Sequence, residues 1–219
     1  MERYLNMGIK AVIKEFPQIE SLLEEYEIGC GPCMVGTCLL KDIVSIHALS
    51  EPDEKELMKR IEGVISNGID PGGAKPEKTA GQPVIYSDPM QKLVDEHTLI
   101  KRWLALIPGV IEYADAKSQS GKRMISDGID MIRSYVDKFH HAKEEDILFT
   151  YFDESAQIIQ AMYKDHTNAR ALVQNMTKAL NAEDKAFLSE SLLAYRDLLE
   201  HHIQKEDDIL YPWMDRQLS

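Results

Sequence analysis

Apolar residues recur at intervals of three and four along four long stretches in the second part of the chain. These stretches cover residues 88–116, 120–149, 154–180 and 183–211, and such spacing places apolar side chains on one face of a helix. The breaks between the stretches are short, and short connections make consecutive helices antiparallel neighbours. We therefore predict an antiparallel up-down four-helix bundle over residues 86–219, with Pro108-Gly109 ending or kinking its first helix.

The first 65 residues show the same spacing in shorter segments. Residues 8–16, 17–27, 36–49 and 52–65 are expected to form short helices, with Ser50 as the N-cap of the last one. Residues 66–85 are rich in glycine and proline, which removes any regular periodicity. The predicted fold class is all-α: a small helical module over residues 1–65, a flexible linker over 66–85, and then the bundle.

Composition and charge narrow the class of protein. The chain has 219 residues, of which 44% are hydrophobic and 28% are charged, and its formal net charge is -12. We expect no nucleic-acid partner, because phosphate binding needs a basic surface. No apolar run approaches the ~20 residues of a membrane-spanning helix, and no export signal is recognisable. We therefore expect a cytoplasmic protein without a membrane partner.

Two parts of the bundle repeat the same residues. Residues 140–149 read HHAKEEDILF and residues 202–211 read HIQKEDDILY, an offset of 62 positions. A second, shorter repeat relates residues 95–98, DEHT, to residues 164–167, KDHT, at an offset of 69 positions. The bundle is therefore predicted to consist of two copies of a helical hairpin. Each copy contributes one lone histidine and one His-x-x-x-Glu.

The His-x-x-x-Glu spacing places both side chains on the same helix face, one turn apart. The repeat selects His140 with Glu144 and His202 with Glu206. Apolar residues one turn away on either side direct His140 and His202 into the core. The two lone histidines, His97 and His166, also lie among apolar helical neighbours, so all four helices are expected to bring one histidine inward.

Each His-x-x-x-Glu histidine has a histidine next to it in the sequence. The helical neighbours of His141 include Asp137 and Arg133, and those of His201 include Asp197. Because these neighbours are polar, we expect His141 and His201 to point outward.

A histidine on an apolar stripe is more often an ordinary core residue than a ligand. Four imidazoles and two carboxylates in one core, however, would cost several kcal/mol if they were left unpaired. Two divalent cations resolve this conflict if each takes two histidines and both share Glu144 and Glu206 as bridges. Imidazole and carboxylate ligands suit iron, manganese or zinc, and we favour iron. A metal-free hydrogen-bond network of histidine and glutamate is the alternative.

This pattern resembles the hemerythrin-like (HHE cation-binding) family over about residues 86–213. The resemblance implies a non-heme di-iron centre of two iron ions with carboxylate and oxo or hydroxo bridges. The residues that match the family motif are His97, His140, Glu144, His166, His202 and Glu206.

Two positions depart from the oxygen-carrying members of that family. Arg170 stands where those proteins have a fifth histidine, and they bridge from the fourth helix with an aspartate at spacing five, where this chain has Asp207. The pattern is more similar to the di-iron proteins that repair iron-sulfur clusters, which also carry a small cysteine-containing module ahead of the bundle.

Three cysteines, Cys30, Cys33 and Cys38, lie within nine residues of the first module. A Cys-x-x-Cys pair near a helix N-terminus suits redox cycling or metal capture, and Cys38 with His47 could complete a second metal site. Reduced thiols packed at a tight turn are the simpler interpretation.

These features lead to a functional hypothesis of a stress-response protein that handles nitric oxide, oxygen or peroxide at the di-iron centre. Its partners would be the small oxidant and an iron-sulfur protein client or a reductant. The alternative is reversible binding or sensing of oxygen or nitric oxide without turnover, and a third is a bundle that uses its metals only for stability. The sequence leaves open whether the protein is an enzyme.

Overall fold

The computed structural model describes residues 1–26, 28, 38–47, 49–73 and 85–218 of the chain, and these residues are mainly helical. Their one β-type pairing is an isolated bridge between Gly8 and Leu39. The all-α fold class is therefore confirmed. The chain forms two compact units, one of residues Tyr86–Asp207 and one of residues Met1–Ile85 with Asp208–Ser219. The domain boundaries expected from the sequence stay a prediction.

The unit that contains the N-terminus is built from short helices. They are α1 (Glu2–Leu5), α2 (Ile9–Glu15), α3 (Gln18–Glu25), α4 (Leu40–Ile46), α5 (Glu51–Asn67) and α11 (Tyr211–Leu218). Ser50 caps α5 as expected, because its hydroxyl accepts a hydrogen bond from the backbone N–H of Asp53. Helix α3 packs on α5, and the buried Arg60 donates to Asp70 and Glu25 across that unit.

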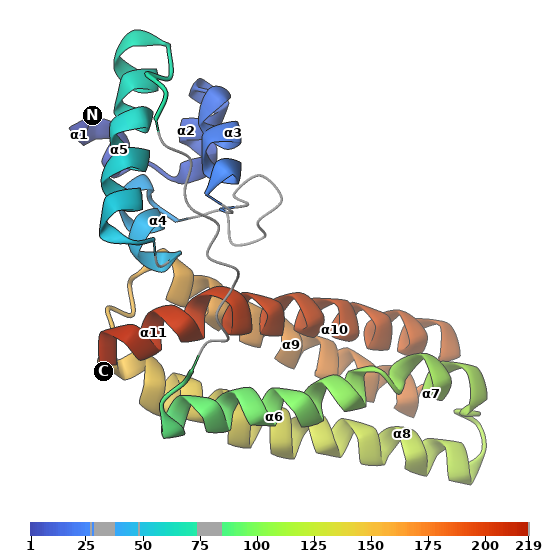
Figure 1. Ribbon diagram of the computed structural model, residues 1–219. Coiled ribbons are helices and arrows are strands. Elements are labelled where there is room, and N and C mark those ends of the chain that lie inside the picture. Colours follow the sequence, from blue (N-terminus) through green and yellow to red (C-terminus); the bar gives the residue numbers. More distant parts are fainter. Residues whose placement is uncertain (27, 29–37, 48, 74–84, 219) are drawn as a thin grey trace. The chain divides into compact units, whose positions relative to one another are not determined.

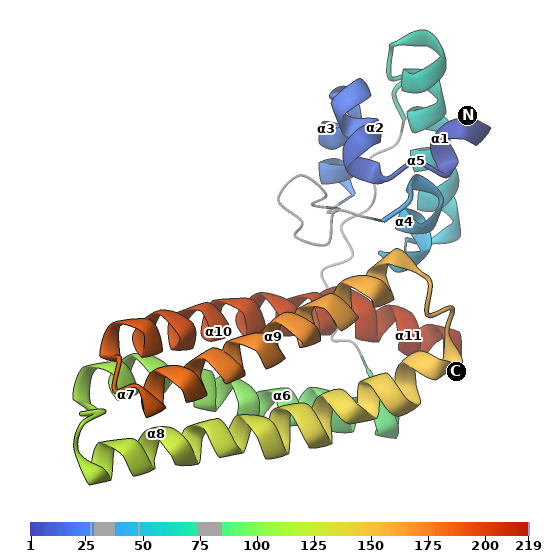
Figure 2. The same cartoon turned by 180° about the vertical axis from the view of Figure 1, so that it is seen from behind.

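The other unit is the bundle. It comprises α6 (Asp88–Leu104), α7 (Ile107–Tyr113), α8 (Gln119–Met131), η1 (Ile132–His141), η2 (Glu144–Leu148), η3 (Phe149–Tyr151), α9 (Gln157–Asn181), α10 (Lys185–Lys205) and the start of η4 (Glu206–Leu210). Helix α6 contacts α10, α10 contacts α9, α9 contacts α8, and η1 returns to α6. The bundle thus has four long helical rods: α6 with α7, α8 through η3, α9, and α10 with η4. Figures 1 and 2 show their closed arrangement from opposite sides.

The first rod of the bundle is interrupted where the sequence predicted a break. Helix α6 ends at Leu104, and Pro108 lies in the first turn of α7, where the N–H that proline lacks would have no helical partner anyway. The turn into α8 is tight, since a β-carbon at Gly121 would overlap the carbonyl group of Asp115. Ser118 caps α8 by accepting a hydrogen bond from the N–H of Gly121.

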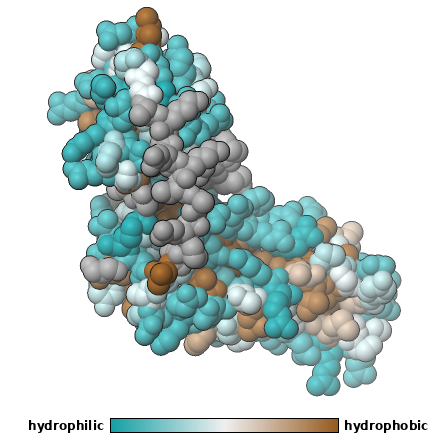
Figure 3. Space-filling view, in the orientation of Figure 1, coloured by the Kyte–Doolittle hydropathy of each residue, from teal (hydrophilic) through white to brown (hydrophobic). Residues whose placement is uncertain are grey.

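A buried apolar cluster fills the bundle at the end away from the histidines. Its members are contributed by all four rods and include Ile100, Leu104, Ile125, Ile129, Val173, Met176, Leu188, Leu192 and Tyr195. The outer face of the bundle seen in Figure 3 is mostly hydrophilic, with apolar side chains toward the end that carries α7. Among the helices of the described residues, none has the length and apolar character needed to cross a membrane.

Helical geometry changes near the histidines. The second rod leaves the α-helical pattern after Met131 and continues as the π-helices η1 and η2, and the fourth rod does so only from Glu206 onward. In a π-helix the hydrogen bond spans five residues instead of four, and such segments occur frequently at functional sites.

Candidate metal centre

Each rod of the bundle brings one histidine to a common point in the core. These histidines are His97 from α6, His140 from η1, His166 from α9 and His202 from α10, and all are buried. They meet in two pairs through their Nε2 atoms, which lie 2.9 Å apart in His97 and His140 and 3.2 Å apart in His166 and His202.

Two glutamates lie between the histidine pairs, and neither exposes any surface. Glu206 has one carboxylate oxygen 3.3 Å from His97 Nε2 and the other 3.1 Å from His202 Nε2. Glu144 Oε2 lies 3.8 Å from His140 Nε2 and 3.5 Å from His166 Nε2. Each carboxylate therefore reaches both pairs, which is the arrangement expected of a bridge between two cations.

The structure thus brings together the six residues selected from the sequence. Together with His141, the six residues form two groups of potential ligand atoms, and the atoms of each group lie within 4.8 Å of one another. One group contains His97, His140 and Glu206, and the other contains His141, Glu144, His166 and His202. That the six residues bind metal stays a prediction, which the geometry of the donors supports.

A second layer of carboxylates lies at the outer nitrogens of the four histidines, with hydrogen bonds to three of them and an ion pair with His202. The partners of Nδ1 are Asp207 for His97 at 2.7 Å, Glu96 for His140 at 2.9 Å, Glu145 for His166 at 2.6 Å and Asp165 for His202 at 3.5 Å. A carboxylate at Nδ1 leaves Nε2 directed at the centre and raises its basicity, as in most histidine metal sites. The local sequence pattern does not single out these residues, although each lies beside a repeat histidine or glutamate.

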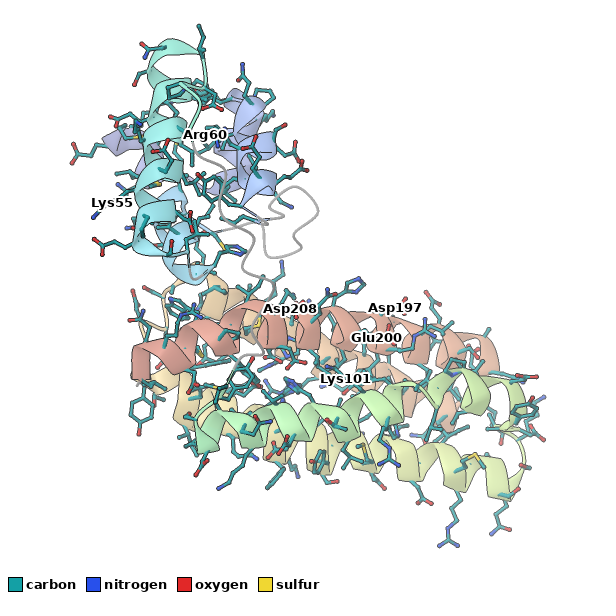
Figure 4. All side chains as sticks on the ribbon, viewed as in Figure 1. Lys55, Arg60, Lys101, Asp197, Glu200 and Asp208 are labelled. Atoms are coloured by element: carbon teal, nitrogen blue, oxygen red, sulfur yellow. The ribbon has the colours of Figure 1, made fainter. Side chains whose placement is uncertain are left out.

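Each outer carboxylate is itself paired with a cationic side chain. Lys101, labelled in Figure 4, donates to Asp207 at 2.6 Å, and Arg170 donates to Glu145 at 2.9 Å. The other two pairs are Lys143 with Glu96 and Lys205 with Asp165. These contacts neutralise the outer layer and fix its orientation. They also place Asp207 on the outer side of His97, so that Glu206 is the acidic residue of this segment that faces the centre.

The orientation predicted for His141 is wrong. Its side chain is buried, with 1% of the residue exposed, and it stacks on His166 with ring centroids 3.9 Å apart. The prediction assumed α-helical geometry, whereas His141 lies in the π-helix η1, in which consecutive residues turn through a smaller angle about the axis. Both His140 and His141 therefore face inward.

The prediction for His201 is confirmed. This residue lies in the regular α-helix α10 and is exposed, and its Nδ1 donates to the carbonyl oxygen of Asp197 in the preceding turn. The repeat does not separate the two histidines, because it aligns His141 with Ile203 and His201 with Phe139, which are both apolar. Ile203 is buried, whereas 49% of Phe139 is exposed.

Burial and close charges shift the pKa values of the residues in this core. Burial lowers the pKa of His140 and His166. Burial would also lower the pKa of His202, but Glu206 and Asp165 outweigh it and raise this pKa to about 9. Burial alone would raise the pKa of Glu206, yet the nearby His202 and His97 hold it well below its ordinary value. A buried carboxylate is thus balanced by imidazolium, and a bound cation could take over this role.

The residues fit a pair of borderline metal ions. Imidazole nitrogens and carboxylate oxygens converge in a buried site, and this donor set suits iron, manganese or zinc. Within the part of the chain that the structure describes, no cysteine belongs to either group of converging ligand atoms. The converging ligand atoms of the bundle therefore do not form a thiolate-rich structural zinc site.

Comparison with known proteins agrees with this donor set. The hemerythrin HHE cation-binding domain matches residues 88–214, which is more than half of the chain. The chain belongs to the hemerythrin HHE cation-binding family. Its bundle is accordingly a metal-binding, hemerythrin-like helical domain, and the resemblance inferred from the sequence is confirmed.

Relatives among curated proteins have no described function. An uncharacterised protein of Mycobacterium bovis and two uncharacterised proteins of Mycobacterium tuberculosis are each 26% identical to this chain over 153 residues. The alignment covers 65% of this chain and 59% of each relative. No solved structure matches the chain significantly.

The cysteine predictions concern the other unit. Cys30, Cys33 and the expected helix start at Gly36 lie outside the described residues. Cys38 is buried, and its carbonyl oxygen accepts a hydrogen bond from the N–H of Ile9. Burial lowers the pKa of His47, but Cys38 and His47 do not belong to a group of converging ligand atoms among the described residues. A second metal site at the cysteines stays a prediction.

Proposed function

We propose that the bundle binds two iron ions and reacts with a small oxidant, namely nitric oxide, oxygen or peroxide, during oxidative or nitrosative stress. The observation that carries the proposal is the position of Glu144 and Glu206, each of which reaches both histidine pairs. Two such carboxylates in one buried core are suited to two cations and would serve a single ion poorly. When bound, the irons supply electrons and a coordination position for the oxidant.

The protein residues have three tasks in this proposal. The four repeat histidines direct Nε2 at the ions because carboxylates hold Nδ1 on the outer side. Glu144 and Glu206 compensate the positive charge inside the core. The apolar cluster beyond the histidines keeps bulk water from one end of the site, which strengthens the electrostatic interactions there.

Turnover measurements test this function. Reduced, iron-loaded protein should consume many equivalents of nitric oxide or peroxide in the presence of an electron donor, and the Glu206→Ala variant should not. Reversible binding of one equivalent without consumption would contradict the proposed reaction and favour the binding or sensing hypothesis.

Repair of iron-sulfur clusters is a narrower form of this proposal, supported by the resemblance to the repair proteins. In it, Cys30 and Cys33 exchange electrons with a reductant or contact the client protein. A Cys30→Ser/Cys33→Ser double variant should keep its iron, because the bundle supplies all the ligands, but lose turnover with the reductant. Unchanged turnover in this variant would contradict a redox role for the two thiols.

A further inference from the structure

The two halves of the bundle differ at one position in the core and at one position at its edge. The sequence repeat aligns Asp137 and His141 with Leu199 and Ile203, and both apolar residues are 1% exposed. The second half thus packs two aliphatic side chains where the first half has an acid and an imidazole. Because burying a polar group without a partner is unfavourable, the buried imidazole of His141 needs a role that Ile203 does not have.

His141 lies beside the ligand atoms of one half of the centre. One of its ring nitrogens is within 4.8 Å of the ligand atoms of Glu144, His166 and His202. Neither ring nitrogen has a hydrogen-bond partner within the described structure, although the residue is almost fully buried. A buried imidazole whose nitrogens have no hydrogen-bond partner, placed beside three converging donors, is suited to bind a cation.

Asp137 lies on the outer side of His141, as Glu96 does for His140. Its Oδ1 is 4.0 Å from His141 Nδ1 and accepts a hydrogen bond from Arg170 Nε at 2.7 Å. The His141 ring now stacks on His166 at an interplanar angle of 13°, so two parallel rings cannot both point at one ion. The second side-chain torsion of histidine is soft, so a turn of the His141 ring on metal binding is available.

A cavity next to His141 gives the ring room for this turn. The cavity has a volume of about 340 Å³, and its walls include His141, Asp137, Arg170 and the buried Tyr195. Further apolar and polar side chains of η1 and α9 complete the walls. Close packing therefore does not fix the orientation of the His141 ring on this side.

We propose that His141, oriented by Asp137, is a fifth imidazole ligand of the ion that His166 and His202 bind. The inference rests on the proposed two-metal centre. It makes the two ions unequal, with three imidazoles on one and two on the other. The ion at His97 and His140, which has the fewer protein ligands, is then the one that leaves more room for the oxidant.

Substitution with cobalt tests the inference directly. In the full chain loaded with Co²⁺, each ligated imidazole with an N–H gives a proton resonance that the metal shifts strongly and that exchanges with solvent. The wild-type protein should give five such resonances, from His97, His140, His141, His166 and His202. The His141→Leu variant should give four, and the matched His201→Leu variant should keep five. Asp137→Asn should weaken binding of one of the two ions by about 10-fold or more.

Four resonances in the wild-type protein, or an unchanged spectrum in His141→Leu, would overturn the inference. The wild-type count requires no variant, so it decides the question even if His141→Leu fails to fold. The cobalt content distinguishes failure of the His141 assignment from failure of the two-metal centre. Two Co²⁺ per chain with four resonances would overturn only the role of His141, whereas fewer than two Co²⁺ would overturn the two-metal centre as well.

Discussion

The two halves of the bundle carry nearly the same chemistry on different helix geometry. In the first half, His97 is preceded by Glu96, and in the second, His166 is preceded by Asp165. The two carboxylates have the same role, since each lies at the Nδ1 atom of the His-x-x-x-Glu histidine in its own half. The inner ligands and the outer carboxylates therefore follow the repeat.

The halves differ in where the α-helix gives way to the π-helix. The second rod is π-helical from Ile132 to His141, before and through its histidines, whereas α10 stays α-helical through Lys205. Two histidines face inward in the first case and one in the second. The comparison teaches that a sequence repeat fixes which residues are available, while local hydrogen bonding decides which of them reach the core.

Loss of a bridging carboxylate should have the largest effect, and it should be the same in both halves. Glu144→Ala and Glu206→Ala each remove a charge that reaches both histidine pairs, so both variants should lose most of their metal. Elemental analysis of the purified variants measures this. Asp207→Ala is the matched control, because it removes only the outer partner of His97. Greater metal loss from Asp207→Ala than from Glu206→Ala would make Asp207 the bridge.

Changes in the outer carboxylates should have intermediate effects. Glu96→Gln and Asp165→Asn occupy equivalent positions of the repeat, and each should weaken metal binding by about 10- to 100-fold, the usual range for partners of histidine ligands. Competition with a chelator measures the affinities. A loss in one variant and none in the other would show that the symmetry of the outer layer is only apparent.

The cationic side chains that pair with the outer carboxylates should have smaller effects, and their contributions to the free energy of unfolding should be unequal. Arg170 donates hydrogen bonds to two acids, Asp137 and Glu145, whereas Lys101 donates to Asp207. Both side chains are more than a third exposed, so solvent screens them. We expect Arg170→Met to lower the free energy of unfolding of the metal-free protein by about 1 kcal/mol or less, and Lys101→Met by still less. Chemical denaturation would show equal losses in the two variants if the halves were equivalent.

His201→Ala should have the smallest effect. This side chain is exposed and makes its hydrogen bond to the backbone of its own helix. Metal content should equal that of the parent, and the free energy of unfolding should change by no more than about 0.5 kcal/mol. Loss of metal from this variant would mean that the face assigned to α10 is wrong.

Much of this arrangement follows from the sequence. Helical periodicity and short breaks predicted the bundle, and the repeat register selected His140 and His202 with their glutamates. The orientation of His141 did not follow, because the change from α- to π-helix depends on packing between rods and has no clear signal in local periodicity. The repeat gave no help, because it aligns His141 with Ile203 and His201 with Phe139, which are both apolar.

The role of the outer carboxylates could not be predicted from the sequence for a different reason. Glu145 and Asp207 follow the bridging glutamates by one position, so within one helix they appear as ordinary solvent-facing acids. Their partners, His166 and His97, lie on other helices. Only the placement of the rods side by side brings each acid to the Nδ1 atom of a histidine in the opposite half.

The metal content of the wild-type protein tests the central claim most directly. Protein produced in iron-replete medium and purified in air should contain two iron ions per chain and show near-ultraviolet ligand-to-iron charge-transfer absorption. These properties follow if Glu144 and Glu206 join two ions held by the histidine pairs. One metal ion per chain, or none after iron-replete production, would contradict the account.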